Sequence, residues 1–247
     1  LNKEDGYLYK FRKDENVKLN FSFAGFLIQE NYISIEKEKI LSYDFSSTSL
    51  QWKFAIKKLG PYADNYGKEK TYEVNKFIGR FYNTLLFVIE SNFILILDFK
   101  TGNFVKLVNI CKALQLNEAT FGNMRPYDIY LDKDKGLVLW LSFHYYIKIE
   151  ATTLEPKLIK NYALGEKEQW WNIKHSTPYD NFIVFNADYG DKRISPDYLG
   201  VADIKTGEIL WSEKIIKKGF LVDNPQASQN KLYQRDNNNN LYIYEKE

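Results

Sequence analysis

The sequence of 247 residues contains one cysteine, one methionine and two histidines. With Cys111 alone, the chain can form no internal disulfide and no thiolate zinc cluster. His144 and His175 lie far apart in the sequence, which argues against a histidine metal centre and against a Ser-His-Asp triad. The sequence therefore predicts no metal site, no cofactor and no catalytic constellation, and we expect a protein that is not an enzyme.

An excess of charge of one sign is also missing, because 34 Lys and Arg face 32 Asp and Glu with the two signs interspersed. The densest basic cluster, Lys214 to Lys218, has the pattern of a strand end with a solvated face, so nucleic-acid binding is not expected. The longest apolar stretches, Thr84 to Ile89 and Phe93 to Leu97, have strand length and predict no membrane span. We expect a soluble protein of the bacterial cytoplasm or periplasm. Because the sequence begins at Leu1, a removed signal peptide, lipid anchor or tag leaves the compartment open.

Aromatic residues are abundant, at 17% of the chain, with 19 Tyr, 17 Phe and 5 Trp. This composition favours strands over helical bundles. Hydrophobic side chains make up 45% of the residues, enough for one all-β domain with a sizeable core. We therefore expect residues 1–247 to form a single all-β domain.

An internal repeat organises the chain. Four segments each contain an acidic residue that ends an apolar run, followed three positions later by a hydroxyl side chain. The acids are Asp44, Asp98, Glu150 and Asp203, about 53 residues apart. Further apolar runs precede and follow each acid, so each unit is expected to contain about four short strands.

The ends of the chain complete the pattern. Glu245 is a fifth acid, but the sequence stops before a fourth strand can follow it. Gly6 to Phe11 is predicted to be an unpaired strand that can add to the C-terminal hairpin. A ring of four-stranded sheets leaves only short, protected edges. The prediction is a β-propeller of about five four-stranded blades, closed by N- and C-terminal strands that share a blade.

The fourth unit carries a family resemblance. Its segment Ala202-Asp203-Ile-Lys-Thr206-Gly207-Glu-Ile-Leu-Trp211 resembles the Ala-x-Asp-x-x-Thr-Gly-x-x-x-Trp repeat of pyrroloquinoline-quinone-type propellers. The resemblance implies that Trp211, and by analogy Trp52, packs between neighbouring blades. Quinoprotein dehydrogenases resemble this chain only in the repeat, and their cofactor site typically includes an adjacent-cysteine disulfide that one cysteine cannot form. We therefore expect a non-catalytic member that uses the repeat as a scaffold.

The turns after the acids have a mechanical explanation. An Asp side chain accepts bonds from backbone N–H groups two or three residues on, and the Gly of Asp-x-x-Thr-Gly accepts positive φ. Asn237 to Asn240 occupies the equivalent of a hairpin loop in the last unit, where Asn tolerates left-handed geometry. We therefore expect a loop there.

Two adjacent tryptophans lie near the start of the fourth unit. Because Trp170 and Trp171 cannot face the same side of a strand, we expect one in the core and the other exposed beside His175. An exposed Trp next to charged groups is typical of a recognition hot spot, while core packing of this segment remains the alternative. His144, between two predicted strands, is expected to be a solvated loop residue.

A second candidate contact region is an insertion, Asn186 to Gly200, which interrupts the repeat in the fourth unit. Insertions in repeat folds often carry the binding function, and this one contains Tyr189 and Arg193. Arg80 and Arg125 complete the predicted partner-binding set.

The sequence favours a protein that binds another protein, is a monomer on its own, and can serve as a bacterial immunity protein that neutralises a cognate toxin. Two alternatives stay open. A five-bladed glycoside hydrolase needs two or three carboxylates near the inner strands, and Asp128, Asp180 and Asp223 are the candidates, although Asp beside Pro or Asn is also typical of turns. The other alternative is a cell-envelope scaffold or assembly protein.

Overall fold

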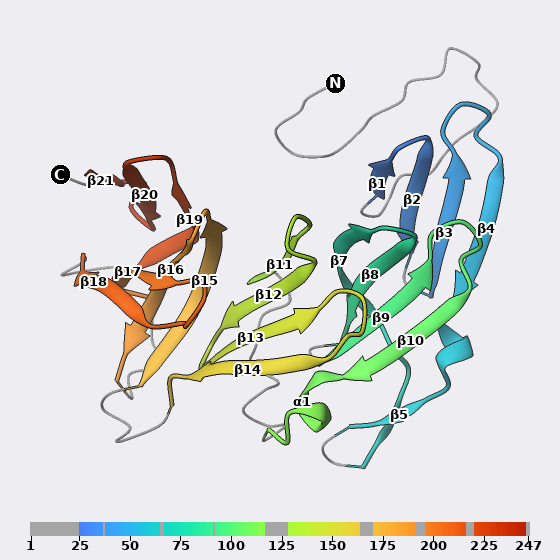
Figure 1. Cartoon of the computed structure of the whole chain (residues 1–247), viewed down its shortest axis with the longest axis horizontal. Coiled ribbons are helices and arrows are strands. Elements are labelled where there is room, and N and C mark those ends of the chain that lie inside the picture. Colours follow the sequence, from blue (N-terminus) through green and yellow to red (C-terminus); the bar gives the residue numbers. More distant parts are fainter. Residues whose placement is uncertain are drawn as a thin grey trace. The chain divides into compact units, whose positions relative to one another are not determined.

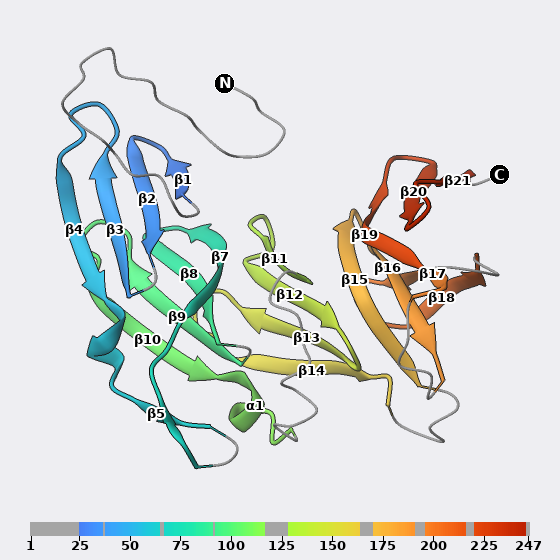
Figure 2. The same cartoon turned by 180° about the vertical axis from the view of Figure 1, so that it is seen from behind.

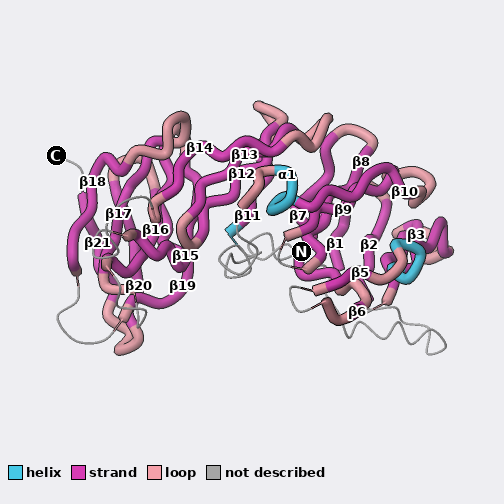
Figure 3. The backbone as a smooth tube through the Cα atoms, turned by 90° about the horizontal axis from the view of Figure 1, so that it is seen from below, coloured by secondary structure: helices cyan, strands magenta, loops and turns pink. Residues whose placement is uncertain are grey.

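The computed structural model describes residues 25–36, 38–64, 67–90, 92–116, 128–163, 170–190, 196–215 and 220–245. In these ranges the regular secondary structure is almost entirely β-strand, and the helices η1 (Ile56–Leu59) and α1 (Ile110–Ala113) are single turns (Figure 1, Figure 3). No helix in this part of the chain has the length and apolar character needed to cross a membrane.

The strands form successive antiparallel sheets. The first sheet contains β1 (Gly25–Ile28), β2 (Asn31–Glu36), β3 (Lys39–Asp44) and β4 (Leu50–Ala55). The second contains β7 (Val74–Phe81), β8 (Thr84–Ile89), β9 (Phe93–Asp98) and β10 (Phe104–Asn109). The third contains β11 (Ile129–Asp132), β12 (Leu137–Ser142), β13 (Tyr145–Glu150) and β14 (Pro156–Asn161). The fourth contains β15 (Trp171–Tyr179), β16 (Phe182–Tyr189), β17 (Tyr198–Asp203) and β18 (Ile209–Lys214). The fifth contains β19 (Leu221–Ala227), β20 (Lys231–Asp236) and β21 (Leu241–Glu245), and a small hairpin pairs β5 (Tyr62–Ala63) with β6 (Glu69–Lys70).

The repeat predicted from the sequence is confirmed at the level of the sheet. Each of the first four sheets is a meander of four strands in chain order, and the repeated acids Asp44, Asp98, Glu150 and Asp203 are the last residues of their third strands. The fifth sheet has three described strands. The segment Gly6 to Phe11 lies outside the described residues, so the number of blades and the closure of the ring stay predictions.

The predicted bounds of the insertion are wrong. Strand β16 continues through Tyr189, and β17 begins at Tyr198. Both ends of the predicted insertion therefore belong to strands, and the segment that connects these two strands is residues 190–197. The reason is that β16 has eight residues, whereas the second strands of the first three sheets, β2, β8 and β12, have six each.

The chain divides into two compact units, residues 1–108 and 109–247, which are described separately. In the first unit, the core between the first and second sheets contains Ile33, Phe54, Phe87 and Leu95, each at most 2% exposed. In the second unit, one cluster joins the third sheet to the fourth, and a smaller cluster joins the fourth to the fifth. Strand β19 accordingly lies beside β15 (Figure 2).

The acid turns have the expected geometry. The Asp98 carboxylate accepts hydrogen bonds from the Lys100 and Thr101 N–H groups at 3.0 and 2.8 Å, and Gly102 has φ +68°. Asp203 repeats this arrangement with the N–H groups of the residues two and three positions on, and Gly207 has φ +71°. These hydrogen bonds lower the pKa of both carboxyl groups, with the side-chain and backbone bonds of the Thr as the leading causes. The Asn237 to Asn240 loop is also confirmed, with Asn239 at φ +63°.

Aromatic side chains from one sheet pack against the acid turn of the next sheet, that is, against the turn that follows its repeated acid. In the first unit, the indole N–H of Trp52 on β4 donates to the Phe99 carbonyl at 2.9 Å, and the ring lies against Gly102. In the second unit, the Tyr162 hydroxyl donates to the Gly207 carbonyl at 2.6 Å. We call these two pairs the inter-sheet contacts.

Trp211 takes a related place in the second unit. It packs with Leu199 and Leu221 between the fourth and fifth sheets, with its ring 5.6 Å from that of Tyr244. The expected packing of Trp52 and Trp211 between neighbouring sheets is therefore confirmed.

Candidate functional site

Three large aromatic rings meet at one end of the fourth sheet. Trp171 is the first residue of β15, Tyr189 the last of β16 and Tyr198 the first of β17. The antiparallel pairing therefore brings the three residues to the same end of the sheet. The Trp171 ring centroid lies 4.7 Å from that of Tyr189 and 5.4 Å from that of Tyr198. We call these three residues the aromatic end.

The aromatic end is anchored on one side and open on the other. Trp171 packs edge-on against the fully buried Phe185, at 5.9 Å, and so continues the core between the third and fourth sheets. Trp171 and Tyr198 are half-buried, whereas Tyr189 is 39% exposed. Rigid aromatic side chains that are supported from below and exposed above are typical of binding hot spots.

An ion pair borders Tyr198. Lys214, the last residue of β18, lies with Nζ 2.7 Å from a carboxylate oxygen of Asp197 and 5.8 Å from the centre of the Tyr198 ring. The hydrogen bond to Asp197, together with the charge of that carboxylate, raises the pKa of Lys214. This border gives the aromatic end a polar rim of the kind that surrounds the apolar centre of protein interfaces.

A bulge in β15 places a second ion pair nearby. The pairing with β16 shifts between Ile173 and His175, which leaves Lys174 as the extra residue. Its ammonium lies 3.1 Å from Asp188, and the two side chains are 16% and 3% exposed. An ion pair this buried contributes little net stability, but the loss of either partner leaves an uncompensated charge. The contact of Lys174 with Asp188 thus depends on a bulge, which the alternation of side chains along a regular strand does not predict.

The prediction that His144 is a solvated loop residue is wrong. His144 is 3% exposed, and its Nδ1 lies 2.9 Å from the Trp171 carbonyl. The cause is tertiary: the turn between β12 and β13 pairs with β15 through two backbone bonds joining Phe143 and Ile173, at 2.7 and 2.9 Å. The third sheet therefore supports the strand that carries the aromatic end.

The two adjacent tryptophans differ less than expected, because both are half-buried. Trp171 points into the aromatic end, and Trp170 packs edge-on against His144 at 5.3 Å. The expectation of one Trp in the core and the other exposed is therefore wrong. His175 lies past the bulge of β15, opposite Asn186, and does not belong to the aromatic end.

Of the three predicted arginines, the structure describes Arg80. Arg80 belongs to the first unit, where its guanidinium lies 3.9 Å from the centre of the Phe99 ring and its Nε donates to the Tyr82 carbonyl at 2.6 Å. Arg125 and Arg193 lie outside the described residues. Tyr198, which the sequence reasoning did not select, takes part instead, and its position at the start of a strand is the signal that was missed.

The three carboxylates considered for a glycosidase have different surroundings. Asp128 is fully buried and accepts bonds from the Ser142 hydroxyl and the Ser176 N–H, both at 3.3 Å. Asp180 is an exposed turn residue with φ +52°. Asp223, with φ +63°, forms an ion pair with Arg235. Asp180 matches the turn geometry that the sequence left open as the alternative, whereas Asp223 lies within strand β19, where the pairing with β20 is irregular between Val222 and Gln226.

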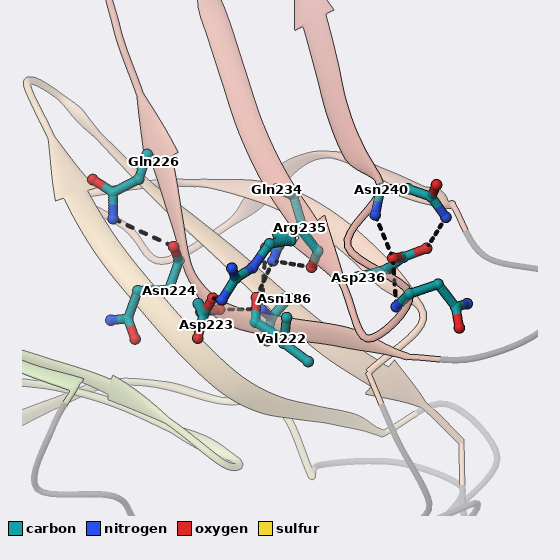
Figure 4. Close-up of polar contacts among 10 residues, drawn as sticks. Asn186, Val222, Asp223, Asn224, Gln226, Gln234, Arg235, Asp236 and Asn240 are labelled. Carbon is teal, nitrogen blue, oxygen red and sulfur yellow. Dashed lines mark hydrogen bonds and ion pairs between the residues drawn. The ribbon is translucent and has the colours of Figure 1, made fainter.

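Asp223 also belongs to a polar network that joins the fourth sheet to the fifth (Figure 4). The Asn186 amide donates to the Asp223 carbonyl at 2.9 Å and to the Gln234 side-chain oxygen at 3.1 Å, and Gln234 donates to the Val222 carbonyl at 2.5 Å. Asn186 and Gln234 are almost fully buried, at 0% and 2% exposure. Buried side-chain hydrogen bonds of this kind favour one register between packed elements, so the surroundings of Asp223 support an architectural role.

Comparison with known proteins places the fold. No protein-family model matches the sequence, and the search of curated proteins gave no match. Among solved structures, Raptor from Chaetomium thermophilum is similar with a TM-score of 0.56 and 12% identity, over 88% of this chain and 19% of that one. The β-propeller domain of Cps50 (Swd1) from Myceliophteria thermophila is similar with a TM-score of 0.52 and 12% identity, over 87% of this chain and 62% of that one.

This chain therefore spans less than two thirds of the length of either protein. At 12% identity the likeness concerns the fold alone. Together with the successive four-stranded antiparallel sheets, it shows that the chain has a β-propeller fold.

Proposed function

We propose that this chain is a non-catalytic β-propeller that binds another protein through the aromatic end of its fourth sheet. The observation that carries the proposal is the cluster of Trp171, Tyr189 and Tyr198, supported by the core beneath and bordered by the Lys214–Asp197 ion pair. Tyr and Trp bury large areas at a low cost in conformational entropy, and they are enriched among the residues that dominate binding.

The test is affinity capture with matched variants. Tyr189 and Tyr179 are 39% and 36% exposed and lie at opposite ends of the β15–β16 hairpin. We expect the wild type and Tyr179→Ser to recover the same stoichiometric partner from the native cells, and Tyr189→Ser to recover at least tenfold less. Equal recovery by the two variants, or no partner with the wild type, would contradict the proposal.

The non-catalytic part of the proposal has its own experiment. Asp180→Asn and Asp223→Asn change exposed carboxylates, one in a turn and one on β19, and should leave partner binding unaltered. A glycoside hydrolase that used these groups would lose its activity on a panel of aryl glycosides. Measurable hydrolysis by the wild type that either substitution abolishes would replace the binding proposal with an enzymatic one.

In its narrower form, we propose that the partner is a toxin and that the chain is its bacterial immunity protein. The support is a scaffold whose candidate surface consists of aromatic and paired charged side chains rather than of a reactive group. A toxin-like gene beside this one, whose product is neutralised by the wild type but not by Tyr189→Ser, is the expected finding. Full protection by Tyr189→Ser would contradict the use of this surface.

We also propose that five blades close into a ring, with Gly6 to Phe11 adding a fourth strand beside β21. The support is the fifth sheet, which has three described strands where the first four sheets have four. Deletion of residues 1–11 should then speed amide hydrogen exchange in β21 and leave β12 protected. Unchanged exchange in β21 after the deletion would exclude this closure.

A further inference from the structure

The first unit contains a groove whose lining residues are distant in sequence from those of the aromatic end. It has a volume of about 260 Å³ and lies between the end of β4 with helix η1 and the start of β10 with its preceding turn. Its lining residues are Lys53, Phe54, Lys58, Leu59, Thr101, Gly102, Asn103, Phe104 and Leu107.

The bottom of the groove is apolar and held in place. Phe54 is 2% exposed and belongs to the core, and the half-buried Leu59 and Leu107 pack against the same core. Gly102 is fixed from below by the indole of Trp52, which would lie 2.4 Å from a Cβ at that position. The groove is therefore built on one of the inter-sheet contacts, and we expect little change of its shape on binding.

One wall is an exposed apolar side chain. Phe104 is 51% exposed, although a Phe at the start of an outer strand has no structural need to face water. The next residue, Val105, has the same exposure but does not line the groove. Covering the Phe104 ring would remove apolar surface from water and so favour an apolar ligand group.

The rim carries charge of one sign. Lys53 and Lys58 are exposed, and every charged side chain among the described residues that line the groove is a lysine. An occupant with carboxylates beside its apolar group would complement this rim, and one with ammonium groups would be repelled.

The size indicates what kind of group fits. Pockets for drug-sized molecules and cofactors usually have about 300–1,000 Å³, so about 260 Å³ is better matched to one large side chain. We propose that this groove binds an apolar side chain flanked by carboxylates, presented by an extended acidic segment of a partner protein. The assignment goes beyond the proposed function, because it concerns the first unit and does not require that the aromatic end binds anything.

The experiment titrates the whole, isotope-labelled protein with a synthetic peptide and follows backbone amide resonances by NMR. The probe is acetyl-Ser-Asp-Phe-Asp-Ser-amide, and the comparison peptides replace both Asp by Lys, or Phe by Gly. We expect the probe to shift the Gly102 and Asn103 amides, with at least fivefold weaker binding of either comparison peptide. Raising the salt concentration should weaken binding of the probe.

Matched variants separate the groove from its neighbourhood. Lys58→Glu and Phe104→Ser change groove residues, whereas Lys57→Glu and Val105→Ser change exposed neighbours that do not line it. All four change exposed side chains, so the fold should be retained, which the unperturbed resonances of β8 would verify. We expect the first two to weaken binding about fivefold or more and the second two to leave it unchanged within twofold.

The assignment is overturned if the probe shifts no groove resonance, if the Lys-bearing peptide binds as well as the probe, or if the control variants weaken binding equally. Self-association of the protein that Phe104→Ser abolishes, without peptide binding, would assign the groove to a second copy and likewise overturn the proposal. None of these outcomes changes the capture result for Tyr189→Ser, so the two proposals fail separately.

Discussion

Replacement of Gly102 by Ala is a demanding test of the inter-sheet contacts. Gly102 has φ +68°, a conformation that L side chains rarely adopt. A Cβ built on it would lie 2.4, 2.5 and 2.9 Å from three atoms of the Trp52 ring. That ring is 8% exposed and is held by its N–H bond to Phe99, so it cannot move away freely.

The two effects have separate magnitudes. A left-handed conformation costs a residue with a Cβ about 1–2 kcal/mol, and overpacking of a well-packed contact costs about 1–3 kcal/mol. The expected loss in free energy of unfolding is therefore about 2–5 kcal/mol for Gly102→Ala. At about 2–4 °C per kcal/mol for a chain of this size, the melting temperature should fall by about 4–20 °C.

Gly67 provides a matched control. It has φ +73°, and a Cβ there would meet nothing within 4 Å. Gly67→Ala should therefore show only the conformational cost. Urea denaturation followed by tryptophan fluorescence measures both variants, and their difference isolates the steric part, which we expect to be about 1–3 kcal/mol.

A double-mutant cycle completes the test. In a Trp52→Leu background the ring is gone, so Gly102→Ala should cost no more than Gly67→Ala. If Gly102→Ala and Gly67→Ala destabilise the wild type equally, within about 0.5 kcal/mol, the ring does not restrict the turn and the reasoning is refuted.

Three further predictions concern the second unit. Tyr162→Phe removes the hydroxyl that donates to Gly207 and should lower the free energy of unfolding by about 1–3 kcal/mol in urea denaturation; no measurable loss would show that the bond is dispensable. Lys174→Met leaves Asp188 buried beside no ammonium and should cost about 3 kcal/mol, while adding Asp188→Leu should recover part of this loss; a double variant less stable than Lys174→Met would contradict the pairing. Hydrogen bonds from the turn lower the pKa of Asp203 in the folded protein. The stability that these bonds contribute is therefore fully present above the ordinary carboxyl pKa of about 4, and it is lost as the pH falls through the lower pKa of the folded state. Thermal denaturation from about pH 5 to about pH 2 should show this loss, and Asp203→Asn should make the profile flatter; an unchanged profile would count against the turn's contribution.

The sequence was most informative where structure is local. An Asp that ends a strand and a Thr and Gly that follow at fixed spacing are enough to form the turn at Asp98 and at Asp203, because the bonds connect neighbours in the chain. The repeated spacing of such turns then determined the four-strand units. The small β5–β6 hairpin lies between the first and second sheets and has no counterpart in the described parts of the later connections, so periodicity could not predict it.

Long-range pairing limited the prediction of the candidate site. His144 is buried because its turn pairs with a strand of the next sheet, and nothing within its own segment indicates that partner. Lys174 reaches Asp188 because of a bulge, which strict alternation does not predict. The selection of Trp171 and Tyr189 identified two of the three rings, since large aromatic residues at strand ends are visible in the sequence even when their contacts are not.

The inter-sheet contacts give the chain a direction. The aromatic donors Trp52 and Tyr162 come from the fourth-strand side of one sheet, and their acceptors Phe99 and Gly207 lie in the acid turn of the next. Both contacts run in the same sense along the chain, from the C-terminal end of one sheet to the acid turn of the sheet that follows it. An exchange of the two sheets that such a contact joins would separate donor from acceptor. These contacts therefore tie the order of the sheets in space to their order in the chain.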